Sequence, residues 1–146
     1  MVIGSDHRGY KLKAHFITWL ESKGFVVEDA GPKSPDAADY PDYALAVARK
    51  VVAGVDTWGI LICSNGVGMA MTANKVKGIR AALCCTPAMA DQSRRHNNAN
   101  VLCLGADNQS MEAGLEILES WLKASFEGGR HEKRVQKMMA AERLCD

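Results

Sequence analysis

The stretch Trp58-Gly59-Ile60-Leu61-Ile62-Cys63-Ser64-Asn65-Gly66-Val67-Gly68 decides the fold class of this chain. An apolar run typical of a buried strand ends at a cysteine, and a turn with two glycines leads into a helix-compatible stretch from Met69. Such a turn can aim several backbone N–H groups at one point, beside the positive end of a helix dipole. A thiol at that point has a reason to ionise, and an anion bound there has a reason to stay.

Similar apolar runs lie on both sides of this stretch and alternate with helical patterns. The expected strands span residues 1–4, 25–27, 60–62, 79–84 and 101–104. Helices are expected to begin after the first strand, at Asp39 or Asp42, at Met69, at Thr86-Pro87 and at Ser110. Continuous apolar strands that alternate with helices favour a parallel sheet covered on both faces. The sequence therefore predicts an α/β, three-layer Rossmann-like fold with a five-stranded parallel sheet.

The chain after Leu122 follows a different pattern. Gly128-Gly129 interrupts it, and a final helix is expected from about Arg130, with Val135, Met138 and Met139 as an apolar stripe. No strand follows this helix. We therefore expect residues 125–146 to form a dimerisation tail that packs on a partner subunit, within a single domain of residues 1–146. The alternative, which the sequence leaves open, is that the tail folds back on its own domain.

The composition excludes several classes of protein. The chain has 146 residues, is 47% hydrophobic and carries a net charge of +1, so no nucleic-acid or membrane surface is expected. No apolar run approaches the roughly 20 residues that a membrane span needs, and no signal peptide is visible at the start of the sequence. The five cysteines include no CxxC pair, which favours a reduced, cytoplasmic protein.

Chemically active side chains gather near the expected strand ends. Asp6 and His7 follow the first strand and Cys63 ends the third, while His96 and Asn97 lie just before the fifth. Ligands of such folds bind at the carboxyl ends of the strands. An acid, an imidazole and a thiol at these positions therefore indicate a ligand site, with a second imidazole close in sequence to another strand.

Two arginines of the expected last helix suit a phosphate. Arg130 and Arg134 are four residues apart and share a helix face. Each candidate also fits a purely structural role: a buried thiol, a helix cap, a cation at a helix end or a solvated face. His15 and His131 are expected at the surface. No metal-site spacing is present, so no metal is expected.

The ordered set of motifs resembles the type B ribose-5-phosphate isomerase family, which includes galactose-6-phosphate and allose-6-phosphate isomerases. The motifs cover nearly the whole chain: residues 4–7, 39–41, 63–68, 73–75, 78–81, 95–97, 100–102 and 127–131. The resemblance implies interconversion of aldose and ketose phosphates through an enediolate without a metal or organic cofactor. It also implies that active sites form between two subunits of a homodimer or homotetramer, with the C-terminal helix reaching across.

The resemblance assigns roles to individual residues. Cys63 would be the base that moves a proton between C1 and C2, and His96 would help to open the sugar ring. The residues that would bind substrate are Asp6 and Asn97 at the hydroxyls, Tyr40 lining the site, His7, Arg130 and Arg134 at the phosphate, and the amides of Ser64, Asn65, Gly66, Val67 and Gly68 at the enediolate. Some members use a glutamate six positions after the cysteine. Met69 occupies that position here, so Cys63 is the candidate base.

Two positions depart from the family pattern. Many relatives have Gly-Thr where this chain has Ser64-Asn65, so a hydroxyl proton shuttle would be lost. Many also have an arginine at the position of Asp107, where an aspartate would repel phosphate. The leading hypothesis is isomerisation of ribose 5-phosphate and ribulose 5-phosphate. The alternatives are an isomerase of a six-carbon sugar phosphate, a non-catalytic phosphosugar-binding protein and a redox-sensing thiol protein.

Overall fold

The described part of the chain is built around one parallel sheet. The computed structural model describes residues 1–145; Asp146, the last residue of the expected tail, lies outside the described residues. The strand order is β2-β1-β3-β5-β4. The strands are β1 (Val2–Ser5), β2 (Glu28–Asp29), β3 (Gly59–Cys63), β4 (Ala81–Leu83) and β5 (Val101–Gly105). The helices are α1 (Tyr10–Ser22), α2 (Tyr40–Ala53), α3 (Val67–Ala73), α4 (Pro87–Asn97), α5 (Met111–Lys123) and α6 (Arg130–Ala140), followed by a 3-10 turn (Ala141–Cys145).

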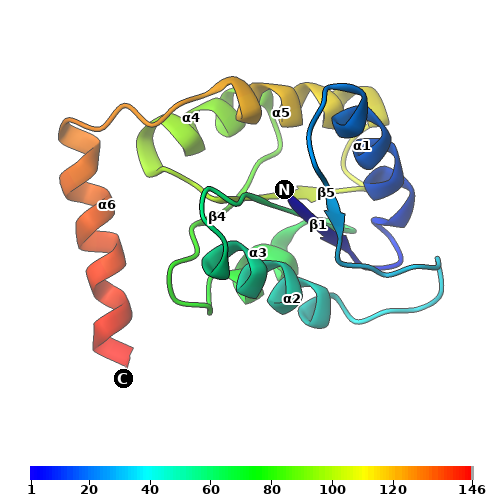
Figure 1. Ribbon diagram of the computed structural model, residues 1–146, viewed down its shortest axis with the longest axis horizontal. Coiled ribbons are helices and arrows are strands. Elements are labelled where there is room, and N and C mark those ends of the chain that lie inside the picture. Colours follow the sequence, from blue (N-terminus) through cyan, green and yellow to red (C-terminus); the bar gives the residue numbers. More distant parts are fainter. Residues whose placement is uncertain (146) are drawn as a thin grey trace.

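Helices cover both faces of the sheet, as Figure 1 shows. Alternate residues of β3 supply the two cores: Ile60 and Ile62 pack with α1, α4 and α5, whereas Leu61 and Cys63 pack with α2 and α3. Because both faces are buried, the strand is apolar at every position rather than at every second one. The predicted three-layer α/β fold with a five-stranded parallel sheet is confirmed.

The connections of the sheet reverse direction between β1 and β3. These two strands are neighbours, with Ser5 opposite Ile62, and the Asp6 N–H donates to the Ile62 carbonyl over 3.1 Å. The chain leaves β1 through α1 on one face and leaves β3 through α3 on the other. In open α/β sheets such a reversal creates a crevice at the carboxyl ends of the two strands. The segments after Ser5 and after Cys63 meet at this crevice.

The second strand was predicted at the wrong residues. Residues 25–27 are not paired, and the strand forms instead at Glu28–Asp29, opposite Val2 and Ile3. The Val26 carbonyl accepts a hydrogen bond from the N-terminal ammonium, and its side chain is 87% exposed. Because β2 is a two-residue edge strand with one neighbour, it needs no apolar run.

Most helix starts follow the predicted cap residues. The hydroxyls of Thr86 and Ser110 accept hydrogen bonds from the N–H groups three residues later, at the starts of α4 and α5. Asp39 occupies the cap position of α2, but its side chain makes no capping hydrogen bond. The helix α3 begins at Val67 rather than Met69, because the left-handed conformation of Gly66 already closes the turn.

The helix α6 stands apart from the three layers (Figure 1). The tail nevertheless makes some contacts with its own domain. The Gly78 N–H donates to Glu142 Oε1 over 2.8 Å, and Arg80 Nη1 lies 3.6 Å from Met139 Sδ. Val135 is buried, whereas Met138 is 44% exposed. In residues 1–145, no helix is long and apolar enough to cross a membrane.

Candidate active site

The thiol of Cys63 lies inside the glycine turn, as the sequence predicted. Its side chain is buried, and the Gly66 N–H donates to Sγ over 3.1 Å. Gly66 has a φ of +79°, and a Cβ there would lie 2.5 Å from Leu83 Cδ1 and 2.9 Å from the Leu104 carbonyl carbon. Only glycine fits this position, so the close approach of backbone and sulfur depends on it.

The same turn already uses some of its own hydrogen-bonding groups. The Val67 N–H donates to Asn65 Oδ1 over 3.0 Å, and the Ser64 carbonyl accepts from the Asp107 N–H over 2.9 Å. The amides of Gly66 and Val67, both expected to face the enediolate, are thus engaged inside the turn. Gly68 is the second residue of α3, where an N–H has no partner within the helix.

Three further predicted residues lie at this edge of the sheet. Asp6 is buried, and its Oδ1 accepts from the Gly9 N–H over 3.0 Å. Gly9, not Asp6, occupies the cap position of α1, so Asp6 stabilises the turn before the helix. The exposed His7 places Nδ1 3.3 Å from the backbone of Ala38. Tyr40 begins α2 and lies against Gly68, where an added Cβ would lie 2.6 Å from Tyr40 Cε2.

An ion pair closes one side of this edge. Arg8 donates from Nε and Nη2 to Asp107 Oδ2, over 3.2 and 2.9 Å. Asp107 was expected to repel a phosphate. Because Arg8 neutralises its charge locally, that expectation is weakened. The sequence analysis did not single out Arg8.

His96 and Asn97 lie at the opposite edge of the sheet. The helix α4 leaves the carboxyl end of β4 and returns to the amino end of β5, so its last residues lie where the strands begin. Cys63 pairs with Gly105 at the other end of β5. Four residue steps of roughly 3.3 Å separate the two edges, or about 13 Å. A single chain therefore does not bring His96 to Cys63.

The candidate residues consequently form two half-sites. The thiol half-site consists of Asp6, His7, Tyr40, Cys63 and the turn of residues 64–68. The imidazole half-site consists of His96, Asn97, Arg130 and Arg134. Asn97 also lines a cavity of about 720 Å³ between β4 and the C-terminal tail, together with Arg80 and Met138.

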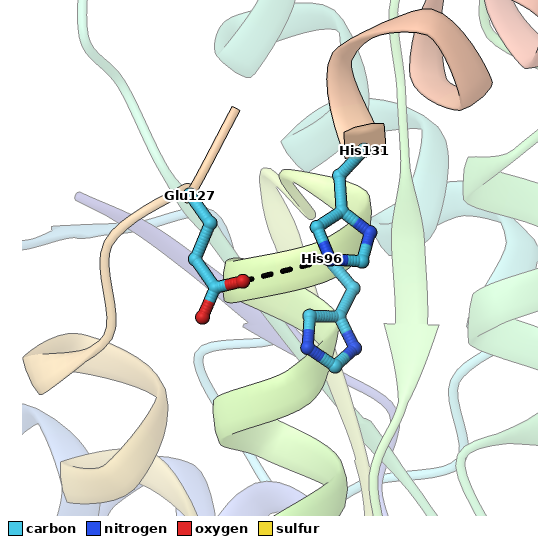
Figure 2. A group of neighbouring side chains, drawn as sticks. All are labelled: His96, Glu127 and His131. Carbon is cyan, nitrogen blue, oxygen red and sulfur yellow. Dashed lines mark ion pairs between the residues drawn. The ribbon is translucent and has the colours of Figure 1, made fainter. Parts of the chain in front are cut away.

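Figure 2 shows His96 of the imidazole half-site together with Glu127 and His131. The rings of His96 and His131 are stacked, with centroids 4.3 Å apart and planes 10° from parallel. His131 Nε2 lies 3.5 Å from Glu127 Oε2. The expectation that His131 lies at the surface was wrong, because the residue is only 6% exposed. His15, by contrast, is exposed as expected.

The charges around these rings are partly compensated. Arg95 donates from Nε to Glu127 Oε1 over 2.7 Å, and chiefly this hydrogen bond lowers the pKa of Glu127. Burial lowers the pKa of His131, and the charges of His96 and Arg130 lower it further. Both effects favour the neutral form of His131.

His96, Glu127 and His131 also have the donor types of a metal site, with ligand atoms within 4.8 Å of one another. This grouping was not visible as a spacing in the sequence. Arg95 already binds the carboxylate, and Arg130 Nε lies 3.5 Å from His131 Nε2. Two guanidinium groups beside the donors oppose a divalent cation. The geometry fits a stacked histidine pair better than a metal centre.

The sequence analysis did not assign a role to Glu127 or His131. Their separation of four residues would place them on one face of a continuous helix. Gly128-Gly129 lies between them, however, with φ values of +65° and +52°, so the chain is not helical there. The direction in which these glycines turn the chain brings α6 against α4.

Comparisons with known proteins identify the family. A model described as Ribose/Galactose Isomerase matches residues 1–138. Ribose-5-phosphate isomerase B of Escherichia coli is 43% identical over 142 residues, covering 97% of this chain and 95% of the relative. The structure of Clostridium thermocellum ribose-5-phosphate isomerase B matches with a TM-score of 0.97 and 45% identity, covering 99% of this chain and 98% of that one. The enzyme from Mycoplasma genitalium, solved with bound ribulose-5-phosphate, matches with a TM-score of 0.94 and 46% identity over 97% and 95% of the two chains. The chain therefore belongs to the ribose/galactose isomerase family and is a sugar-phosphate isomerase.

Proposed function

We propose that this enzyme interconverts ribose 5-phosphate and ribulose 5-phosphate through an enediolate. The observation that carries the proposal is the Cys63 thiol, held 3.1 Å from the Gly66 N–H at the crevice between β1 and β3. Relatives of more than 40% identity, among them the one with bound ribulose-5-phosphate, support this choice of substrate. The pairing of Asp107 with Arg8 weakens the main argument for a binding protein without catalysis.

The chemistry needs a base close to a weakly acidic C–H and a donor for the developing oxyanion. In the aldose-to-ketose direction, the Cys63 thiolate removes the proton from C2 and returns a proton to C1, while a proton passes from O2 to O1. The N–H of Gly66 stabilises negative charge on the sulfur before the transfer. The neighbouring turn, with Gly68 in the first turn of α3, supplies donors for the enediolate oxygens. These steps use side chains and backbone of the protein alone, without a metal or organic cofactor.

The imidazole half-site completes the reaction from a second subunit. His96 assists opening of the sugar ring, Asn97 and Asp6 bind hydroxyl groups, and Arg130 and Arg134 bind the phosphate with His7. Because the two half-sites lie at opposite edges of one sheet, a two-fold pair of chains can form two complete sites. The exposed apolar residues of α6, such as Met138, suit packing on that partner. The assembly is thus a homodimer, or a homotetramer made of such dimers.

The first test measures formation of ketose from ribose 5-phosphate by the purified protein, with Cys63→Ala beside it. We expect turnover by the wild type and a loss of at least about 100-fold in the variant, the lower end of what acid–base groups contribute. A panel with galactose 6-phosphate and allose 6-phosphate decides between five-carbon and six-carbon substrates. Full activity of a folded Cys63→Ala protein would refute the assigned base.

The second test mixes two inactive proteins. Cys63→Ala and His96→Ala chains are unfolded together and refolded, so that mixed dimers form. If sites are shared, half of the dimers are mixed and each of them carries one intact site, giving about a quarter of the wild-type activity. Each variant refolded alone stays inactive. A mixture that remains inactive, although mixed dimers are present by mass, would show that each chain completes its own site.

The protein is proposed to work in the cytoplasm. Cys63, Cys84, Cys85 and Cys103 are all free thiols. Free thiols persist in a reducing compartment, and a base that acts as a thiolate requires one.

A further inference from the structure

His131 presents a rigid, flat surface to His96 (Figure 2). It is the second residue of α6 and is 6% exposed, whereas His96 is half-buried at the end of α4. A side chain at a helix end retains rotational freedom unless neighbours restrict it. The stacked ring restricts His96 to one plane, so the direction of its nitrogens depends on His131.

Glu127 is hydrogen-bonded to α4 through Arg95. Its N–H donates to the Arg95 carbonyl over 3.0 Å, and its Oε1 accepts from Arg95. Arg95 also donates to Asp91 Oδ2 over 3.1 Å, one turn earlier in α4. The second carboxylate oxygen of Glu127 is thereby held 3.5 Å from His131 Nε2. The loop before α6 is thus fixed to the same helix that carries His96.

The charged and titratable groups that face His131 are His96 on α4, Glu127 on the loop, and Arg130 and Arg134 on α6. Burial and the three positive neighbours favour the neutral form of His131, against the single carboxylate. Two stacked imidazolium rings would repel each other. The stacked contact with His96 therefore favours an uncharged His131 ring.

We propose that His131 is a positioning residue for His96: its ring, stacked on that of His96 beside Glu127, sets the imidazole of His96 for ring opening. The inference rests on the proposed function. In ring opening the C1–O4 bond breaks and C1=O1 forms, while O1 loses a proton and O4 gains one. His96 mediates this transfer, and no net proton is consumed. His131 itself touches neither the sugar nor the transferred proton.

Two assays separate ring opening from proton transfer at carbon. The first is turnover of ribose 5-phosphate, which needs both. The second is exchange of solvent deuterium into C1 of ribulose 5-phosphate, followed by proton NMR. This ketose has no five-membered ring to open, so its exchange needs only the base Cys63. The variants are His131→Ala, His131→Phe, which keeps a flat ring, Glu127→Gln, and His15→Ala as the exposed control.

We expect His131→Ala to lower turnover by about 10- to 100-fold while exchange stays within about 2-fold of wild type. His131→Phe should recover most of the turnover, and Glu127→Gln should lower turnover without lowering exchange. His15→Ala should change neither. Gel filtration checks that each variant keeps the assembly of the wild type.

Three results would overturn the inference. Turnover and exchange that fall together in His131→Ala would show a general structural role, and unchanged values of both would show none. A His131→Phe protein as impaired as His131→Ala would mean that stacking is not what matters. By contrast, a wild-type protein that forms no ketose from ribose 5-phosphate would refute the proposed function itself, and persistence of exchange in Cys63→Ala would refute Cys63 as the base. Neither outcome depends on His131.

Discussion

Lys13 Nζ lies 2.6 Å from Asp29 Oδ1 and 2.7 Å from the Pro32 carbonyl, although Lys13 is only 1% exposed. The pair ties α1 to the end of the edge strand β2. Replacing Lys13 by Met should lower the free energy of unfolding by about 3 kcal/mol, because a partly buried carboxylate loses its partner. Urea unfolding measures this. Lys11→Met, at an exposed position of the same helix, is the control and should have almost no effect.

The same pair predicts an acid-dependent contribution to stability. Burial raises the pKa of Asp29, but hydrogen bonds from Lys13 and Gly31 and the nearby charges outweigh it, so the pKa lies below the ordinary 3.8. A lowered pKa stabilises the fold above about pH 3.8, and this contribution is lost as the pH falls through the folded-state value. Asp29→Asn should therefore be less stable than wild type at pH 6, and the difference should shrink in acid. A difference that stays constant from pH 6 to pH 2.5 would contradict this.

Gly66→Ala should damage both stability and turnover. A left-handed alanine costs about 1–2 kcal/mol, and crowding against Leu83 and the backbone of Leu104 adds about 1–3 kcal/mol. The matched control is Gly24→Ala, because Gly24 has a φ of +85° but no atom within 4 Å of an added Cβ. Unfolding of the control should report backbone strain alone. If both variants lose equal stability and keep full turnover, the crowding at the Cys63 turn is not significant.

Arg8 and Asp107 should act on substrate binding as a pair. Arg8→Gln leaves Asp107 uncompensated beside an anionic substrate and should raise KM by about 3- to 10-fold. The double variant Arg8→Gln/Asp107→Asn removes both charges and should have a lower KM than the single variant. Stability should change little, because both side chains are well exposed. A double variant as poor as Arg8→Gln, or poorer, would show that the compensation is unimportant.

The cysteines should differ in reactivity. Burial raises the pKa of Cys84 to about 11 and that of Cys103 well above its usual range, whereas Cys85 is exposed. At pH 8 only about 0.1% of Cys84 is thiolate. Iodoacetamide should therefore label Cys85 first, as read by peptide mass spectrometry, and ribulose 5-phosphate should protect Cys63 without protecting Cys85. Rapid labelling of Cys84 in the folded protein would count against its burial.

Interior strands were predictable because they are buried on both faces. The strands β1, β3 and β5 form where the sequence has apolar runs. The position of the Cys63 sulfur was predictable because Cys63 is the last residue of β3. The edge strand β2 was misplaced, since two paired residues with one neighbour need no apolar signature. Periodicity carries information about burial, and Glu28–Asp29 is held by backbone pairing and by Met1 at its start.

The residues of the candidate site were predictable, but the sequence did not show that they lie in two separate groups within one chain. Asp6, His7 and Cys63 meet because parallel strands share a carboxyl edge. His96 is close in sequence to β5, yet the direction of α4 takes it to the amino edge. His131 was taken for a surface residue because its burial depends on how Gly128-Gly129 redirects the chain, which residue spacing does not specify.

The length of α4 has a consequence for how the enzyme behaves at low abundance. Because this helix carries His96 about one strand length from Cys63, an isolated chain would hold a thiol that has no ring-opening partner. Under the proposed sharing of sites, the concentration of the protein itself becomes a kinetic variable, and specific activity should fall on dilution below the dissociation constant of the proposed dimer. A newly made chain is then expected to remain inactive toward cyclic sugar phosphates until it meets a second copy.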